Sequence, residues 1–177
     1  MNILFVCSRL DTMVSKRGFL ISSLVDEGND VSLISMERHS ETEKKLRDMG
    51  VDFYCVENSR NKVSVFSDIK FLLRLFFLLR VGGFDRVLSY TIKPNVYSGL
   101  AVFFTRSALC FFPFVTGLGY AFQGGGWRRN LLRKITVFLH RFSFSRATKV
   151  VFQNENNMSL FVDLGIVPGR NAVLIMG

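Results

Sequence analysis

The sequence predicts an α/β fold, a Rossmann-like doubly wound and mostly parallel sheet of about seven strands. Two observations predict it. Short apolar runs rich in β-branched and aromatic residues alternate with stretches of helical periodicity along the 177 residues. No internal repeat or low-complexity linker divides the chain, so residues 1–177 are expected to form a single domain. Strand–helix–strand units with right-handed crossovers then give parallel strands with helices on both faces.

The predicted strands are short apolar segments bounded by polar residues or glycine. In chain order they are Asn2–Ser8, Val31–Met36, Val51–Val56, Arg86–Tyr90, Ala108–Val115, Lys149–Phe152 and Ala172–Met176. The run Val96–Val115 is the nearest approach to a membrane span, but Arg106 and Pro113 interrupt it. A span needs about 20 mainly apolar residues, so a helix followed by a buried strand is the favoured interpretation.

The predicted helices lie between these strands. In chain order they are Lys16–Glu27, Ser40–Met49, Ser64–Val81, Asn95–Thr105, Trp127–Ser145 and Glu155–Leu164. A glycine follows the first, second, third and sixth of them, as expected at helix ends. Ser40 is the expected N-cap of the second helix, with Glu43 three residues later, and Pro94 lies near the first turn of the fourth.

Positive charge is concentrated in one internal block. The net charge is +9, and the 69 residues from Arg86 to Asn154 contain ten bases and no acid. Such a block attracts phosphate, whether on lipid headgroups, on a diphosphate ligand or on nucleic acid. The sequence contains no recognised nucleic-acid-binding module, so nucleic acid is the least favoured of the three and is not an expected partner.

Several functional classes lack their motifs. The segment after the first strand, from Ser8 to Arg17, contains no glycine, which argues against a nicotinamide or flavin oxidoreductase. Neither a P-loop nor a GxSxG nucleophile elbow is present. The chain has two histidines and no CxxC, so no metal site is expected. The three cysteines lie in separate strand-like runs and are expected to be buried free thiols of a cytoplasmic protein.

Ligands of such a sheet bind at the carboxyl ends of its strands. The segments there are Ser8–Asp11, Tyr90–Asn95, Thr116–Tyr120 and Gln153–Glu155. Lys93 brings a cation to the start of a helix, where free amides and an ammonium make a candidate phosphate site. The alternative is that Lys93 is solvated and Pro94 only begins the helix.

Two other segments at these strand ends also admit structural interpretations. Gly117 and Gly119 allow a ligand to approach the backbone closely, or they form an ordinary loop. Asn154 is a candidate cap for the following helix, with Glu155 favoured in its first turn.

Trp127–Ser145 is predicted to be a basic amphipathic helix. At 100° per residue its apolar face gathers Trp127, Leu131, Leu132, Ile135, Phe138, Leu139 and Phe142. Its basic side suits an in-plane contact with anionic headgroups, and the candidate membrane-binding residues are Trp127, Arg128, Arg129, Arg133, Lys134 and Arg141. The alternative is an ordinary surface helix that packs with its apolar side inward.

The Ser64–Val81 helix is apolar nearly all round and must be buried, meet a partner or meet lipid.

Three segments resemble, in this order and spacing, the N-terminal domain of family 4 retaining glycosyltransferases. They are Tyr90–Tyr97 (YTIKPNVY), Val115–Tyr120 (VTGLGY) and Val151–Asn156 (VFQNEN). Within this family the chain resembles bacterial enzymes of capsule, O-antigen or N-glycan assembly that add a HexNAc to a sugar on undecaprenyl diphosphate. The resemblance implies the two-domain GT-B architecture. This chain would be its N-terminal acceptor-binding domain, and the C-terminal nucleotide-sugar domain is expected to be absent.

The resemblance also implies roles for matching positions. Lys93 and Asn95 would lie near the acceptor diphosphate or sugar. The residues Gly117, Gly119 and Tyr120 would line the cleft, with Asn154 and Glu155 at its rim. Relatives often carry a glycine-rich first loop and a histidine in the TG loop. This chain has Ser8–Asp11 and Leu118 instead, so no catalytic residue is assigned.

The expected function is that of the acceptor-binding, membrane-associating half of a retaining glycosyltransferase. The complete enzyme would move a sugar, expected to be HexNAc from a UDP-sugar, to a polyprenyl-diphosphate-linked glycan without a metal. It would work on the anionic inner face of the bacterial plasma membrane, reached from the cytoplasm. The chain alone is expected to be inactive and to need the missing donor domain or a catalytic partner. The alternatives are a non-catalytic membrane-anchoring subunit of a split glycosyltransferase and a basic nucleic-acid-binding domain.

Overall fold

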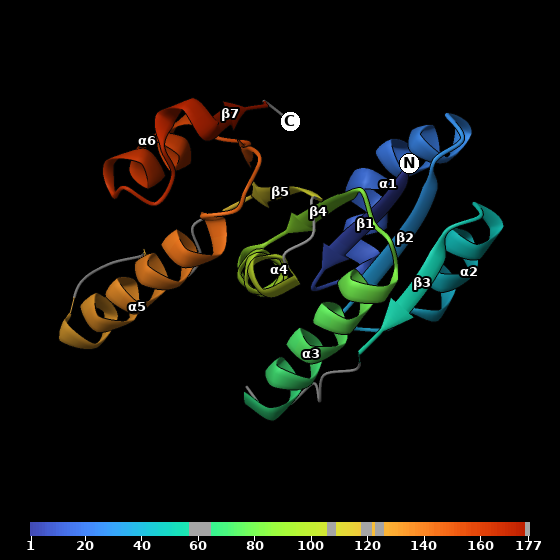
Figure 1. Cartoon of the computed structure of the whole chain (residues 1–177), viewed down its shortest axis with the longest axis horizontal. Coiled ribbons are helices and arrows are strands. Elements are labelled where there is room, and N and C mark those ends of the chain that lie inside the picture. Colours follow the sequence, from blue (N-terminus) through green and yellow to red (C-terminus); the bar gives the residue numbers. More distant parts are fainter. Residues whose placement is uncertain (57–64, 106–108, 118–121, 123–125, 176–177) are drawn as a thin grey trace.

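The computed structural model describes residues 1–56, 65–105, 109–117, 122 and 126–175, except for the side chains of 128 and 129. Strands and helices alternate along the chain (Figure 1). The strands are β1 (Asn2–Cys7), β2 (Asp30–Ser35), β3 (Asp52–Cys55), β4 (Arg86–Tyr90), β5 (Cys110–Val115), β6 (Val150–Phe152) and β7 (Ala172–Leu174). The helices are α1 (Leu10–Asp26), α2 (Ser40–Asp48), α3 (Val65–Val81), α4 (Ile92–Thr105), α5 (Trp127–Phe144) and α6 (Glu155–Asp163), with a 3₁₀ turn over Gly169–Asn171.

The seven strands form one parallel sheet in the order β3-β2-β1-β4-β5-β6-β7, which confirms the predicted fold class. Side chains alternate along β1, so Leu4 and Val6 face a core shared with α3, α4, α5 and α6. Phe5 and Cys7 face the opposite core, which α1 and α2 cover. The strand order reverses between β1 and β4, and this reversal opens a crevice at the carboxyl ends of the two strands.

Helix α4 lies between α3 and α5 and packs against both (Figure 1). It crosses α5 closely at Gly99, where an added Cβ would lie 2.2 Å from the carbonyl oxygen of Ser143. The hydroxyl of Ser143 donates to the carbonyl of Val96 at 3.2 Å. The crossing therefore sets the position of α5.

Two helices begin earlier than predicted. Helix α1 begins at Leu10 instead of Lys16, because the turn after β1 has no glycine and Leu10 and Met13 are buried against the sheet. Helix α4 begins at Ile92 instead of Asn95. Pro94 fits in its first turn, where a backbone N–H has no partner within the helix.

Two smaller predictions were also wrong. The N-cap of α2 is His39 and not Ser40, and its carbonyl accepts from the Glu43 amide at 2.9 Å. Among the cysteines only Cys7 is buried, whereas Cys55 and Cys110 are half-buried, and no disulfide joins any of the three. Burial raises the pKa of Cys7, so this thiol stays protonated.

His140 faces inward from α5 and is 2% exposed. Its Nδ1 lies 2.8 Å from the Thr136 carbonyl, and its ring meets the rings of Phe144 and Phe161 edge-on. Burial lowers the pKa of His140, because the imidazolium would lose its water. Near neutral pH the folded protein therefore holds this imidazole uncharged.

Acidification is expected to destabilise the protein through His140. Below about pH 6.5 the unfolded chain binds a proton at this histidine that the folded chain excludes. The free energy of unfolding therefore decreases as the pH is lowered, by at most about 1.4 kcal/mol per pH unit. His140→Phe removes the effect. Urea unfolding at pH 7.5 and 5.5 is expected to give a smaller stability loss for the variant than for the parent chain. Equal losses would mean that His140 does not carry this pH dependence.

Candidate functional site

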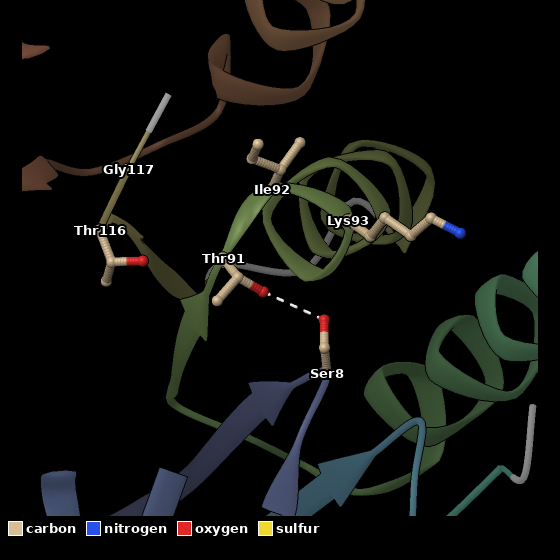
Figure 2. Close-up of a pocket in the computed structure, with 6 residues that line it drawn as sticks. All are labelled: Ser8, Thr91, Ile92, Lys93, Thr116 and Gly117. Atoms are coloured by element: carbon tan, nitrogen blue, oxygen red, sulfur yellow. Dashed lines mark hydrogen bonds between the residues drawn. The ribbon is translucent and has the colours of Figure 1, made fainter. Parts of the chain in front are cut away.

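Two adjoining hollows open at the carboxyl ends of β1, β4 and β5. The first, the crest hollow, has a volume of about 330 Å³ and is lined by Ser8, Thr91, Ile92, Lys93, Thr116 and Gly117 (Figure 2). The second, the α1 pocket, has a volume of about 420 Å³ and is lined by Cys7, Ser8, Arg9, Thr12, Met13, Lys16, Arg17, Tyr90, Thr91, Thr116 and Gln153. Ser8, Thr91 and Thr116 belong to both. The hollows therefore lie side by side at the point where the strand order reverses.

Thr91 is the strained residue of the site. Its φ is 74°, which is rare for a β-branched side chain. Its hydroxyl lies 3.1 Å from that of Ser8 and so joins the ends of β4 and β1 (Figure 2). Its carbonyl accepts the Asn95 amide at 3.0 Å and begins the hydrogen bonding of α4. Backbone strain of this kind concentrates at binding and catalytic sites.

Lys93 lines the crest hollow, but its ammonium points away from Thr116 and Gly117 (Figure 2). Its Nζ donates to both carboxylate oxygens of Asp68 on α3, at 3.0 and 3.1 Å. Burial and the same carboxylate raise the pKa of Tyr97. The Lys93 charge is thus compensated, and the residue fastens α4 to α3.

Asn95 is 1% exposed and lies one helical turn after Thr91, whose carbonyl its amide contacts. Its Oδ1 accepts from the Ser89 hydroxyl at 2.6 Å, and its Nδ2 donates to the Phe114 carbonyl at 2.9 Å. The side-chain oxygen and nitrogen of Asn95 are both hydrogen-bonded, and together they link β4 to β5. The contact with an acceptor that the resemblance implies would need an exposed polar atom, which Asn95 does not have in this structure.

The remaining predicted acceptor contacts are placed differently. Gly117 lines the crest hollow with open space beside its Cα. Gly119 and Tyr120 lie outside the described residues. Asn154 caps α6, accepting from the Asn157 amide at 3.1 Å, and Glu155 is exposed in the first turn of that helix. The structural interpretation of Asn154 is therefore confirmed.

The α1 pocket contains two cations that were not predicted as site residues, Lys16 and Arg17. The helix was predicted to begin at Lys16, and that start did not indicate that Lys16 and Arg17 lie at the crevice. With the true start at Leu10, both residues lie in the second turn of α1 and reach the pocket wall. The signal that would have found them is the absence of glycine after β1, which takes the chain directly into a helix.

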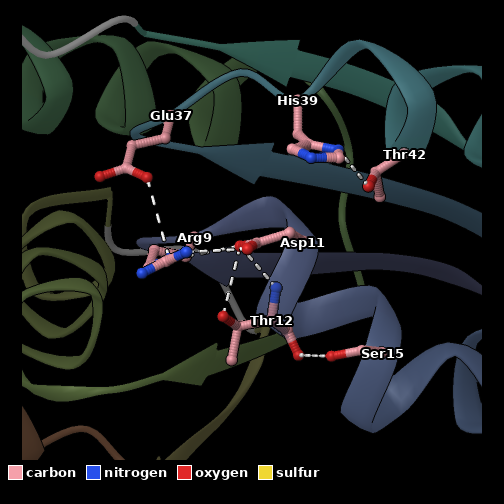
Figure 3. A network of polar contacts seen from close by, with 7 residues as sticks. All are labelled: Arg9, Asp11, Thr12, Ser15, Glu37, His39 and Thr42. Atoms are coloured by element: carbon pink, nitrogen blue, oxygen red, sulfur yellow. Dashed lines mark hydrogen bonds and ion pairs between the residues drawn. The ribbon is translucent and has the colours of Figure 1, made fainter.

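Arg9 stands at the same pocket but is compensated (Figure 3). Its guanidinium lies 2.8 Å from a carboxylate oxygen of Asp11 and 4.0 Å from one of Glu37. The hydrogen bond from Arg9, together with one from the Thr12 amide, lowers the pKa of Asp11 to about 2. Asp11 is thus a permanent anion that neutralises Arg9 and does not exchange protons near neutral pH.

The described lining of both hollows offers hydrogen-bond donors and cations, and it includes no Asp, Glu or His. Cys7 is held as a neutral thiol. Such a lining is suited to binding oxyanions and hydroxyl groups, and it contains no obvious proton acceptor. Over the described residues no group of three or more His, Cys, Asp or Glu side chains could hold a metal ion.

Helix α5 presents its apolar side outward, so the alternative in which that side packs inward is wrong. The exposed apolar side chains of α5 are Trp127, Leu131, Leu132, Ile135, Phe138 and Leu139, and we refer to them as the α5 apolar face. The buried side of the helix carries His140, Ser143 and Phe144. This orientation follows from the close contact of α5 with Gly99, which needs a small side chain on the inner side.

The predicted membrane-binding bases of α5 differ in what their side chains contact. Lys134 is exposed, and the Arg133 guanidinium lies 5.9 Å from the Phe122 ring. Arg141 donates to the Leu164 carbonyl at the end of α6. The side chains of Arg128 and Arg129 lie outside the described residues. In the part of the chain that the structure covers, no helix is long and apolar enough to cross a bilayer.

Comparison with known proteins gives one clear curated relative, and no protein-family model matches the chain. The chain is 28% identical over 155 residues to N,N'-diacetylbacillosaminyl-diphospho-undecaprenol alpha-1,3-N-acetylgalactosaminyltransferase of Campylobacter jejuni. The match covers 88% of this chain and 40% of the relative, so the chain spans about two fifths of the length of that enzyme. The predicted resemblance to enzymes that transfer a sugar to an undecaprenyl-diphosphate-linked glycan is confirmed by this match.

Solved structures share the fold. HepE of Anabaena, in complex with UDP, matches with a TM-score of 0.67 at 13% identity, over 99% of this chain and 44% of that chain. A UDP-N-acetylglucosamine 2-epimerase of Rickettsia bellii matches with a TM-score of 0.66 at 15% identity, over 98% of this chain and 44% of that one. The chain has the Rossmann-like fold of a GT-B glycosyltransferase domain. Because an epimerase matches equally well, the fold alone does not identify the reaction.

Proposed function

We propose that this chain is the acceptor-binding, membrane-associating part of a retaining glycosyltransferase that acts on a polyprenyl-diphosphate-linked glycan. The observation that carries the proposal is the 28% identity, over 88% of the chain, to an enzyme named for transfer to a diphospho-undecaprenol-linked sugar. That relative transfers N-acetylgalactosamine, so HexNAc is the proposed sugar. The UDP complex of HepE supports a UDP-sugar as donor.

The donor is proposed to bind outside these 177 residues. The chain spans 40% of the Campylobacter transferase and 44% of HepE, which leaves room in both for a second domain. Stabilisation of the departing nucleotide diphosphate would come from that part of the enzyme. Such a division agrees with hollows whose described lining has no carboxylate or imidazole.

The acceptor is proposed to lie across the crest hollow and the α1 pocket. The hydroxyls of Ser8, Thr91 and Thr116 suit the hydroxyl groups of a sugar. Gly117 admits a ligand close to the backbone, and we retain Gly119, Tyr120 and the rim residues Asn154 and Glu155 as proposed contacts. Asn95 is proposed to act indirectly, by holding the ends of β4 and β5 in place.

Membrane association is proposed to occur through α5. Amphipathic helices with a free apolar face and flanking bases bind in the plane of the interface. The α5 apolar face is exposed, and Lys134 is an exposed base of the same helix. Helix α3, on the other side of α4, also exposes Phe66, Leu73 and Phe77. The proposed surface is the anionic inner face of the bacterial plasma membrane.

Vesicle binding tests the acceptor assignment. We expect the chain to bind anionic vesicles that carry a polyprenyl-diphosphate-linked N-acetylhexosamine about tenfold more tightly than the same vesicles without it. Neutral vesicles are the control for the lipid surface. With UDP-N-acetylhexosamine added, the chain alone is expected to produce no transfer. Turnover by the chain alone would contradict the proposed division of roles, and tighter binding to oligonucleotides than to either vesicle would favour the nucleic-acid alternative.

A further inference from the structure

Of the two hollows, the α1 pocket has cations without a carboxylate partner among the described residues, and the crest hollow has none. Lys93 in the crest hollow is held by Asp68, and Arg9 by Asp11. Lys16 and Arg17 have no carboxylate oxygen within 4 Å in the described part of the chain. Two neighbouring positive charges at a partly enclosed wall attract a polyanion more strongly than the same charges in open water.

Tyr90 adds a buried hydrogen-bond donor to the same pocket. Its side chain is 4% exposed, and its hydroxyl is buried without a hydrogen-bond partner. The ring is fixed between Phe5 and Phe114, with centroids 6.2 and 4.4 Å away, and the Arg17 guanidinium lies 5.7 Å from its centre. Burial raises the pKa of Tyr90, so the hydroxyl stays protonated and can donate.

A buried donor without a partner is costly in a folded protein, and most such groups are satisfied by water or a ligand. Here the residue that carries the donor lines a pocket beside two uncompensated cations, and Thr12 and Thr91 line the same pocket. Phosphate oxygens accept hydrogen bonds and carry the charge that these cations lack. The side chains around this pocket therefore match a phosphate or diphosphate group.

We infer that Lys16, Arg17 and Tyr90 form a diphosphate subsite in the α1 pocket. The identity of the diphosphate rests on the proposed function. It belongs either to a prenyl-diphosphate acceptor or to a nucleotide, which share this chemistry. In this arrangement the sugar next to the diphosphate reaches the crest hollow, because Ser8, Thr91 and Thr116 line both spaces.

Calorimetric titration of the 177-residue chain tests the subsite with three probes: inorganic pyrophosphate, farnesyl diphosphate and UDP. The double variant Lys16→Gln/Arg17→Gln is expected to bind pyrophosphate and farnesyl diphosphate at least tenfold more weakly. Lys44→Gln/Lys45→Gln on α2 is the matched control. These two exposed lysines line neither hollow, so the control loses the same net charge without touching the pocket. The control is expected to bind both probes like the parent chain.

Tyr90→Phe separates a binding role from a structural one. The variant loses only the unpaired hydroxyl, so its unfolding midpoint without ligand is expected to be unchanged or higher. Its affinity for pyrophosphate is expected to fall several-fold. A purely structural role would leave the affinity unchanged, and that result would remove Tyr90 from the subsite.

The probes also separate this inference from the proposed function. If all three bind the double variant as tightly as the parent chain, the subsite is wrong, while acceptor-dependent vesicle binding can still support the proposed function. If UDP binds more tightly than farnesyl diphosphate and is lost in the double variant, the subsite is supported. The proposed assignment of this chain to the acceptor would then be wrong.

Discussion

Changing Leu131, Ile135 and Phe138 together to glutamine is expected to lower the affinity of the chain for anionic vesicles at least about a hundredfold. These side chains are 53, 46 and 68% exposed, so about half or more of the surface of each is available to enter a bilayer. Burying an apolar side chain of this size contributes roughly 1.5–3 kcal/mol when complete, and three partly buried ones give about 4 kcal/mol. A tenfold change in affinity corresponds to about 1.4 kcal/mol.

The folded state is not expected to suffer from this change, because the α5 apolar face contributes little to the core. The unfolding free energy of the triple variant should lie close to that of the parent chain. Phe19→Gln is the matched control. Phe19 is 88% exposed on α1, which covers the opposite face of the sheet, and its loss is expected to leave vesicle binding unchanged.

Vesicle co-sedimentation at two salt concentrations separates the apolar contribution to vesicle binding from the electrostatic one. The apolar part is expected to persist in high salt. The contribution of bases such as Lys134, about 1 kcal/mol each near an anionic surface, is expected to weaken. If the triple variant binds vesicles as tightly as the parent chain, α5 does not enter the bilayer, and its apolar face would then be a surface for another protein.

The sheet and its element order could be predicted because each element carries local signals. Strands such as Arg86–Tyr90 were predicted with the bounds that the structure shows, and every strand lies in the predicted parallel sheet. The starts of α1 and α4 were predicted too late for a physical reason. Only Ser8 and Arg9 separate Leu10 from β1, and only Thr91 separates Ile92 from β4, so each helix begins almost at the end of its strand and no glycine marks the change.

The site was harder to predict because its chemistry depends on pairing between distant segments. Lys93 looked like a free cation, yet its partner Asp68 lies 25 residues earlier on another helix. Asn95 looked like a ligand contact, yet it joins two strands in the interior. Sequence spacing cannot distinguish a compensated cation from an uncompensated one. Lys16 and Arg17 can be identified as candidate binding residues only after the partners of Lys93 and Arg9 are known.

The orientation of α5 illustrates the same limit. Its periodicity correctly divides the helix into an apolar and a basic side, but periodicity alone does not say which side faces the protein. That choice depends on Gly99 of α4, which is 44 residues from its contact at Ser143. The crossing requires small residues where the two helices touch, and the side of α5 that carries Ser143 therefore faces α4 while the α5 apolar face points outward.

Gly99→Ala is expected to destabilise the protein by about 2 kcal/mol. The added Cβ would lie 2.2 Å from the Ser143 carbonyl oxygen and 2.6 Å from its carbonyl carbon. These are backbone atoms within a helix, so no side-chain rotation relieves the clash, and α4 and α5 must separate. Overpacking of a tight contact typically costs 1–3 kcal/mol, and the gain of up to about 1 kcal/mol from better helix propensity offsets only part of it.

Gly18→Ala provides the comparison for this prediction, because Gly18 is also a glycine inside a helix. Its added Cβ would meet nothing closer than a Val14 methyl at 3.6 Å, an ordinary contact, so helix propensity should dominate. This variant is expected to be stabilised by about 0.5–1 kcal/mol. Urea unfolding of both variants measures the difference. Similar stabilities would mean that the α4–α5 crossing is looser than the structure has it, and the outward orientation of α5 would then lose its physical basis.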